Sequence, residues 1–277
     1  MRELRRTGWA LSWAALIALA SVGCRGGGSD NVFGDLLEPL IPPTPGEAAR
    51  DAFNVFDADK RRRAVALINA SPFGGEDPYL RMYRLLLDDR DATVRAAVAA
   101  ALGDHGTPED ADRLIPLLRD RDGFVRWQAA RALQKLHNPD AIEPLIAVVT
   151  EDDDADARAA AAYALGQFDD PDAFDALVSA LLDLDFGVVT NARDALTMMT
   201  GTDAGDDPAD WLAWAEGRRG ELFVDRLPYG YRPYVPAPAF GSRLAFWRKP
   251  PVVELREPVG LTSAEAGGAS GGGSATP

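Results

Sequence analysis

The chain has very little of the chemistry on which metal centres and covalent enzymes depend. Among its 277 residues there are one cysteine, Cys24, and two histidines, His105 and His137. A single cysteine excludes an internal disulfide. No Ser-His-Asp set, Cys-His set or phosphate-binding glycine loop stands in a context that supports catalysis. The sequence therefore predicts a protein that is not an enzyme and that holds no metal or cofactor.

A long apolar run is missing as well. The apolar run from Trp9 to Val22 has 14 residues, whereas a membrane-spanning helix needs about 20. Three arginines precede it, at positions 2, 5 and 6. A basic start followed by a short apolar run is typical of an export signal, which we assign to residues 1–23.

The end of this run, "SVGC", resembles the signal of bacterial lipoproteins. The resemblance implies that Cys24 is lipidated and becomes the mature N-terminus, followed by a flexible linker over residues 24–46. Ser21 departs from the leucine that is usual in the motif, and "ALA" at 18–20 offers an ordinary cleavage site. We expect an exported protein that is lipid-anchored to a bacterial membrane. A secreted or periplasmic soluble protein is the alternative.

Positive charge is scarce in the middle of the chain. Residues 47–217 have 34 acidic and 17 basic side chains, and residues 151–217 have 17 acids against Arg158 and Arg193. Such a surface repels a phosphate backbone, so nucleic acid is excluded as a partner. The balance reverses over residues 218–258, with eight basic and four acidic residues.

What the chain does have is an internal repeat. Four stretches open with Asp and end with Leu eleven positions later, at spacings of 31, 32 and 31 residues. They are "DATVRAAVAAAL" (91–102), "DGFVRWQAARAL" (122–133), "DADARAAAAYAL" (154–165) and "DFGVVTNARDAL" (185–196). A fixed period of this length indicates a repeat architecture.

Each stretch is predicted to be a helix that follows a first, amphipathic helix. The opening Asp is an N-cap residue, and the places three, seven, ten and eleven residues later form an apolar stripe. Proline opens three of the four preceding segments, at 108, 139 and 171, which suits a first helical turn. Pro116 and Pro144 inside two of them are expected to kink the helix.

Paired helices with "D-x-x-V-R" opening the second helix and "AL" or "ALG" closing it resemble HEAT repeats of the short type also found in phycobilin lyases. The resemblance implies an all-α, right-handed α-solenoid of about four to five helix pairs. It covers residues 77–200 and extends more weakly to "DADKRRRAVALI" at 57–68. We assign residues 47–217 to the solenoid, with a capping helix near its end that uses Trp211, Leu212 and Trp214.

Residues that recur in the repeats are predicted to be structural. Each arginine of the motif is expected to bond the capping Asp of its own or the next repeat, and an anion-binding ladder is the alternative. The fourth copy has Val189 instead of arginine. The structural set is Asp91, Arg95, Asp122, Arg126, Asp154, Arg158 and Asp185.

The catalytic and metal-binding residues of HEAT-like enzymes have no clear counterparts in this sequence. The deoxyhypusine hydroxylases hold iron through His-Glu pairs, but neither His105 nor His137 is followed by Glu. Lyase activity does not follow from the repeats alone. The acidic loops "EDDDAD" (151–156) and "DAGDD" (203–207) lack EF-hand spacing. We interpret these loops as solvated, and calcium binding stays open.

Places where the copies disagree indicate a binding surface. Five and nine residues after the capping Asp, the repeats carry Trp127, Arg131, Tyr163 and Asp194 among small residues. The resemblance implies that second helices line the concave side, where these side chains lie close together. Tryptophan, tyrosine and arginine dominate many interfaces. Packing of Trp127 between helices is the alternative.

Beyond Gly217 the helical pattern ends. Residues 218–258 are rich in proline and tyrosine and favour extended backbone, and residues 259–277 are predicted to be a disordered tail. The basic 218–258 segment is expected to dock on the acidic last repeats, and the alternative is a segment that extends away.

Taken together, the sequence predicts a non-enzymatic, lipid-tethered scaffold that binds a protein or peptide partner at the cell envelope. A lyase-like enzyme or accessory that handles a cofactor is one alternative, and a purely structural envelope brace is another.

Overall fold

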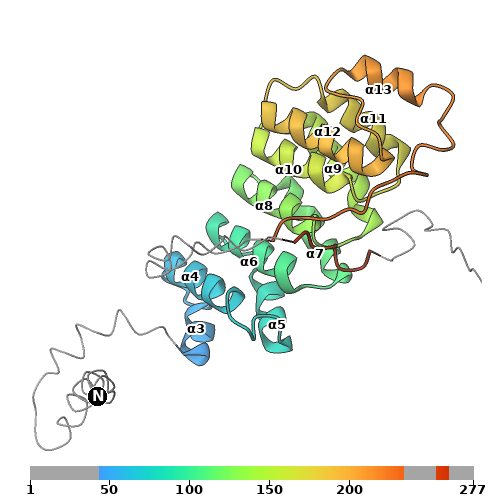
Figure 1. Ribbon diagram of the computed structural model, residues 1–277. Helices are drawn as coiled ribbons and strands as arrows, with labels where there is room; N and C mark the ends of the chain where they lie inside the picture. Colours follow the sequence, from blue (N-terminus) through green and yellow to red (C-terminus); the bar gives the residue numbers. More distant parts are fainter. Residues whose placement is uncertain (1–43, 234–253, 262–277) are drawn as a thin grey trace, which may run out of the picture. The chain divides into compact units, whose positions relative to one another are not determined.

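Successive helix pairs stack along the chain from residue 44 onward (Figure 1). The computed structural model describes residues 44–233 and 254–261, and this part contains eleven α-helices and no β-strand. The all-α solenoid predicted from the repeats is confirmed, with five pairs. In chain order these are α3 (Pro45–Asp51) with α4 (Ala58–Asn69), α5 (Asp77–Leu86) with α6 (Ala92–His105), α7 (Ala111–Leu114) with α8 (Gly123–Leu133), α9 (Ile142–Glu151) with α10 (Ala155–Leu165), and α11 (Pro171–Ala180) with α12 (Phe186–Thr200), followed by α13 (Pro208–Ala215).

The second helices of neighbouring pairs pack directly on one another and form a continuous row from α4 to α12. All sixteen residues of the predicted apolar stripes are buried, with exposed fractions of 0 or 1%. Many of them are alanines, which allow the helix backbones to approach closely. Because each stripe is covered by the next helix in the row, the hydrophobic core runs through the stack without a break.

Two first helices begin as 3-10 turns. Residues Pro108–Asp110 and Pro139–Ala141 are 3-10 turns that precede α7 and α9. Pro116 changes the helix type, since α7 passes into a 3-10 helix at Ile115–Arg119. Pro144, in contrast, is the third residue of α9. At that place its missing N–H needs no partner, so the kink predicted there is replaced by a regular helix start.

The last pair is covered by α13, which packs on α11. Trp211 is fully buried, and its indole N–H donates to the carbonyl of Gly205 at 2.8 Å. The predicted role of Leu212 is wrong, because its side chain is 51% exposed. Helix α12 ends at Thr200 and is capped by Gly201, which has a φ of 70°. An added Cβ at Gly201 would collide with the carbonyl of Asp225.

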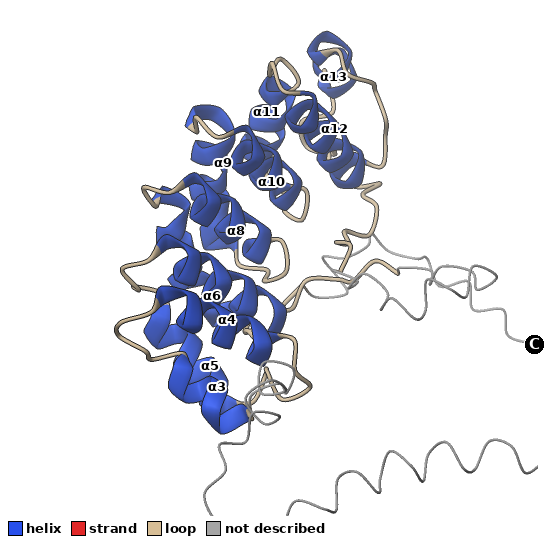
Figure 2. Ribbon diagram, turned by 90° about the vertical axis from the view of Figure 1, so that its left-hand side faces the viewer, coloured by secondary structure: helices blue, strands red, loops and turns tan. Residues whose placement is uncertain are grey.

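Residues 218–233 and 254–261, here called the C-terminal segment, lie against the ends of the second helices (Figures 1 and 2). Leu227 N–H donates to the carbonyl of Met198, at the end of α12, and Val259 N–H donates to the carbonyl of Lys135, just after α8; both distances are 2.8 Å. The part from residue 254 therefore returns to the middle of the stack. Residues 259–261, which we assigned to the tail, are among those with a described position.

Two other expectations concern the N-terminal end. Helix α3 begins at Pro45, two residues before the expected solenoid boundary, because Thr44 and Glu47 form a capping box. The predicted signal, Cys24 and nearly all of the linker lie outside the described residues. Within the described ranges, the helices are all too short or too polar to cross a membrane.

Candidate functional site

In the first four helix pairs, an arginine four residues after the capping Asp of the second helix joins that pair to the next one. Arg95 donates to both carboxylate oxygens of Asp120, at 2.8 and 2.7 Å, and to the carbonyl of Asp89 at 2.8 Å. Asp120 also accepts the N–H of Asp122 at 2.9 Å. We call each such Arg–Asp pair a rung. The same rung recurs in Arg61–Asp89, Arg126–Asp152 and Arg158–Asp183.

The partner of the arginine differs from the one predicted. The carboxylate of each capping Asp is already occupied by backbone N–H groups of its own helix, as in Asp122 with Phe124 N–H at 3.0 Å. The arginine instead reaches the Asp two residues before the next cap. A sequence signal for this existed, since "D-x-D" precedes every one of the four second helices from α6 to α12. The guanidinium groups are engaged within the chain, and the anion-binding ladder finds no support.

The pKa values of the rung carboxylates of Asp120, Asp152 and Asp183 are lowered from that of a free aspartate. Burial is the largest single cause and acts to raise the pKa of Asp120. The hydrogen bonds from Arg95 and from the Asp122 N–H, together with the charge of Arg95, outweigh it, so the pKa is lowered. For Asp183 the hydrogen bond from Arg158 is the largest cause, and it lowers the pKa. These carboxylates stay charged at neutral pH and hold the junctions in register.

A cluster of large side chains lies on α8, here called the α8 cluster and made of Phe124, Trp127 and Arg131. The rings of Phe124 and Trp127 are 5.3 Å apart, and the guanidinium carbon of Arg131 is 4.9 Å from the centre of the Trp127 ring. Phe124 is 52% exposed, and Trp127 is partly buried against the core. Trp127 thus packs on the helices and still presents part of its ring to solvent.

The α8 cluster is unique among the second helices. In place of Trp127, α4 has Arg62, and α6, α10 and α12 have Ala96, Ala159 and Thr190. Phe124 was missed by the sequence analysis, although its place two residues after the cap also differs in every copy. A cation stacked on an aromatic pair is an arrangement that favours protein interfaces.

The structure does not bring all four predicted partner-binding residues onto one free surface. The Tyr163 hydroxyl donates to the carbonyl of Gly230 at 2.7 Å, and the Tyr163 ring lies 5.7 Å from that of Tyr229. Burial, and then the charge of the exposed Asp194, raise the pKa of Tyr163. The C-terminal segment therefore occupies the place next to Tyr163 that was predicted for a partner.

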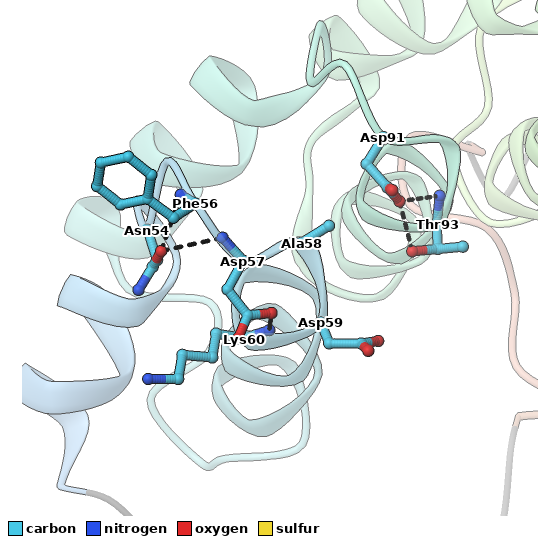
Figure 3. A pocket seen from close by; sticks show the side chains of 8 residues that line it. All are labelled: Asn54, Phe56, Asp57, Ala58, Asp59, Lys60, Asp91 and Thr93. Carbon is cyan, nitrogen blue, oxygen red and sulfur yellow. Dashed lines mark hydrogen bonds between the residues drawn. The ribbon is translucent and has the colours of Figure 1, made fainter.

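A depression of about 670 Å³ lies beside the starts of α4 and α6 (Figure 3). Its polar groups are used by the chain itself. Asp57 accepts Lys60 N–H at 3.0 Å, Asp91 accepts Thr93 N–H at 2.9 Å, and Asn54 accepts Phe56 N–H at 3.0 Å. These are helix caps and a turn, and they leave no convergent polar set for a small ligand.

Acidic side chains of the second acidic loop and both histidines are likewise engaged. In the described ranges no three His, Cys, Asp or Glu residues converge as a metal site would require. In the second acidic loop, Asp203 and Asp206 pair with Arg193 at 2.6 and 3.1 Å. Both histidines contact oxygen atoms of the chain. A ring nitrogen of His105 lies 2.8 Å from the backbone carbonyl oxygen of Asn69, and a ring nitrogen of His137 lies 3.3 Å from the side-chain amide oxygen of Gln167.

Solved structures with similar folds include natural and designed repeat proteins. The complex of CpcE and CpcF of phycocyanin lyase from Nostoc sp. PCC7120 is 20% identical with a TM-score of 0.51, and the match covers 72% of this chain and 76% of that one. A designed armadillo repeat protein is 18% identical with a TM-score of 0.45, over 65% of this chain and 92% of that one. At this identity the first likeness shows the fold alone. No curated protein matches the sequence.

The family of the chain is shown by its sequence. The model for HEAT repeats matches residues 47–134, 80–165 and 112–197, so that the three matches advance by about one helix pair each. Together they run from residue 47 to residue 197, more than half of the 277 residues, and the chain belongs to the HEAT repeat family.

Proposed function

We propose that the protein is a non-enzymatic scaffold, tethered by a lipid at Cys24 to a bacterial membrane, that binds a protein or peptide partner through the α8 cluster. The observation that supports this most is the stack of Phe124, Trp127 and Arg131 on α8. The other second helices have no aromatic residue in the place of Trp127. Half-exposed aromatic residues beside an arginine supply much of the binding energy in many interfaces.

The partner surface is tested by photo-crosslinking in intact cells. A benzoylphenylalanine placed at Phe124 should crosslink a discrete partner, and adding Arg131→Ala should reduce the yield at least about tenfold, as loss of an interface hot spot does. The same group at Phe56 is the matched control, since this residue is 93% exposed but lies on the first pair. Equal crosslinks from both sites would remove the α8 cluster as the binding surface.

The lipid anchor is tested separately. A Cys24→Ser variant should move from the membrane fraction to the soluble fraction and should lose incorporation of labelled palmitate, because no other cysteine exists. Unchanged membrane association would contradict the anchor while leaving the partner surface untouched.

The second candidate, a lyase-like or cofactor-handling accessory, draws only on the likeness to the phycocyanin lyase complex. It predicts a coloured or organic ligand that copurifies with the protein and is lost in a Trp127→Ala variant. Absorption spectra and mass spectrometry of the purified chain distinguish it from the scaffold.

A further inference from the structure

A short stretch of the C-terminal segment is held between two backbone edges. On one side, Val259 N–H donates to the carbonyl of Lys135 at 2.8 Å and the Val259 carbonyl accepts His137 N–H at 2.9 Å. On the other side, Arg256 and Tyr231 exchange two backbone hydrogen bonds, both of 2.9 Å. The first contact is parallel and the second antiparallel. Residues 256–260 thus lie as a short extended stretch in a slot, whose edges are residues 135–137 and Tyr231.

The slot selects residue types as well as backbone. Pro258 is buried, although its neighbours on both sides are exposed. Gly260 has a φ of 95°, and an added Cβ would lie 2.6 Å from Cγ of Pro108 and 3.2 Å from the carbonyl oxygen of His137. An L-residue is therefore disfavoured there by both backbone conformation and space. The occupant has to offer a proline, then one residue with a pairing backbone, then a glycine.

The extended stretch in the slot is exposed over most of its length. Val259 is 50% exposed, so that, apart from the buried Pro258, little apolar area holds residues 256–260 in place. Four backbone hydrogen bonds, each with a net contribution of about 1 kcal/mol, are the main attachment. Addition of an extended peptide to an open backbone edge is a recurring mode of recognition. Because residues 256–260 are weakly buried, another extended peptide can replace them.

We propose that the slot is a docking site for an extended peptide of the type Pro-X-Gly, in which X pairs through its backbone. The chain's own residues 256–260 are its intramolecular ligand, and a segment of the same chemistry on a partner protein displaces them. This inference is independent of the α8 cluster, because the slot is made by backbone groups of residues 135–137 and Tyr231 and by Pro108. The two sites have separate tests.

The test uses a fluorescent peptide with the sequence of residues 254–261, "ELREPVGL", and the full chain. An intramolecular ligand competes at a high effective concentration, so the wild type should bind the peptide weakly. Gly260→Val in the protein vacates the slot without altering its edges. Binding should then tighten by about tenfold or more by fluorescence anisotropy. Pro258→Ser is a second vacating variant, and Leu255→Ala is the matched control that should behave as the wild type.

The peptide supplies the complementary control. N-methylation of its Val259 removes the N–H that bonds the Lys135 carbonyl and should weaken binding to the Gly260→Val protein at least about fivefold, the value of one hydrogen bond. N-methylation at Leu255 should have no such effect. Equal binding to the wild type and both vacated variants, absence of binding to either vacated variant, or indifference to N-methylation at Val259 would each overturn the proposal. Concentration-dependent dimers of the wild type by sedimentation would reassign the extended stretch to a second copy and overturn the proposal as well.

Discussion

The four rung junctions and the C-terminal end of the stack are stabilised by different kinds of contact. From α4 to α12, each junction is held by an arginine of one pair and an aspartate of the next, as in Arg95 with Asp120 at 2.7 Å. Helix α12 itself has Val189 where that arginine would be. There, buried Trp211 and Arg226 take over, and Arg226 pairs with Asp169 at 2.5 Å and donates to the Gln167 carbonyl at 3.2 Å.

This difference teaches how a repeat protein ends. A rung needs a following pair to supply its aspartate, and the last pair has none. The exposed end of the row must instead be covered by residues that occur once, which here are aromatic and basic. The repeated part is therefore specified by a local code, and the end is specified by contacts between distant positions.

The largest expected effect comes from breaking the covered end. Trp211→Ala should lower the free energy of unfolding by about 4 kcal/mol, because a fully buried indole is replaced by a cavity beside Phe174 and Trp214. Chemical denaturation measures the change. Leu212→Ala on the same helix is the control, and a comparable loss from it would contradict the assignment of the buried face.

Loss of one rung should lower the free energy of unfolding somewhat less than Trp211→Ala does. The side chains of Arg95 and Asp120 are only 8% and 10% exposed, so Arg95→Ala leaves a carboxylate with little solvent and without its partner. We expect a loss of about 3 kcal/mol in thermal or denaturant unfolding. Arg113→Ala removes the same charge from an exposed place and should leave stability unchanged. If both variants unfold alike, the rungs do not hold the junctions.

The C-terminal segment contains one buried and one exposed arginine, which should contribute differently to stability. Arg226 is 7% exposed, and Arg226→Ala should lower stability by about 2 kcal/mol through its lost charge-assisted hydrogen bonds. Arg219 pairs with Asp175 at 2.9 Å but is exposed, so Arg219→Ala should leave the melting temperature at the wild-type value.

Deletion of residues 218–277 should destabilise the protein at least as much as Arg226→Ala. An unchanged melt in low salt would show that the segment does not dock.

The smallest effect is a dependence on pH. The pKa of Asp183 is lowered in the folded chain by the hydrogen bond from Arg158. The stabilisation by its charge is therefore present above the unfolded pKa of about 3.9 and is lost as the pH falls through the folded pKa. Asp183→Asn should be less stable than the wild type at pH 7, and the gap should narrow below about pH 4. Asp172→Asn, at an exposed place, should follow the wild type throughout, and a gap that stays constant would argue against the rung as its cause.

Much of the fold could be read from local pattern. The capping aspartates, the apolar stripes and the 31-residue period each depend on residues close in sequence, and their consequences repeat in every copy. The partner of each rung arginine was predicted wrongly, because only the capping Asp was considered and not the Asp two residues before it. The carboxylate of Asp122 was already used by its own helix, and only the arrangement in space selects Asp120.

The candidate binding surface divides along the same line. The sequence by itself determined the helix pairs, their order and the unusual residues on α8, because a helix fixes which residues share a face. Only the tertiary structure decided that Tyr163 is covered by Tyr229 and Gly230 and that residues 256–260 return to Lys135. Such contacts join positions that are 66 or more residues apart. Most of them use backbone groups that every residue carries, so no local sequence pattern predicts them.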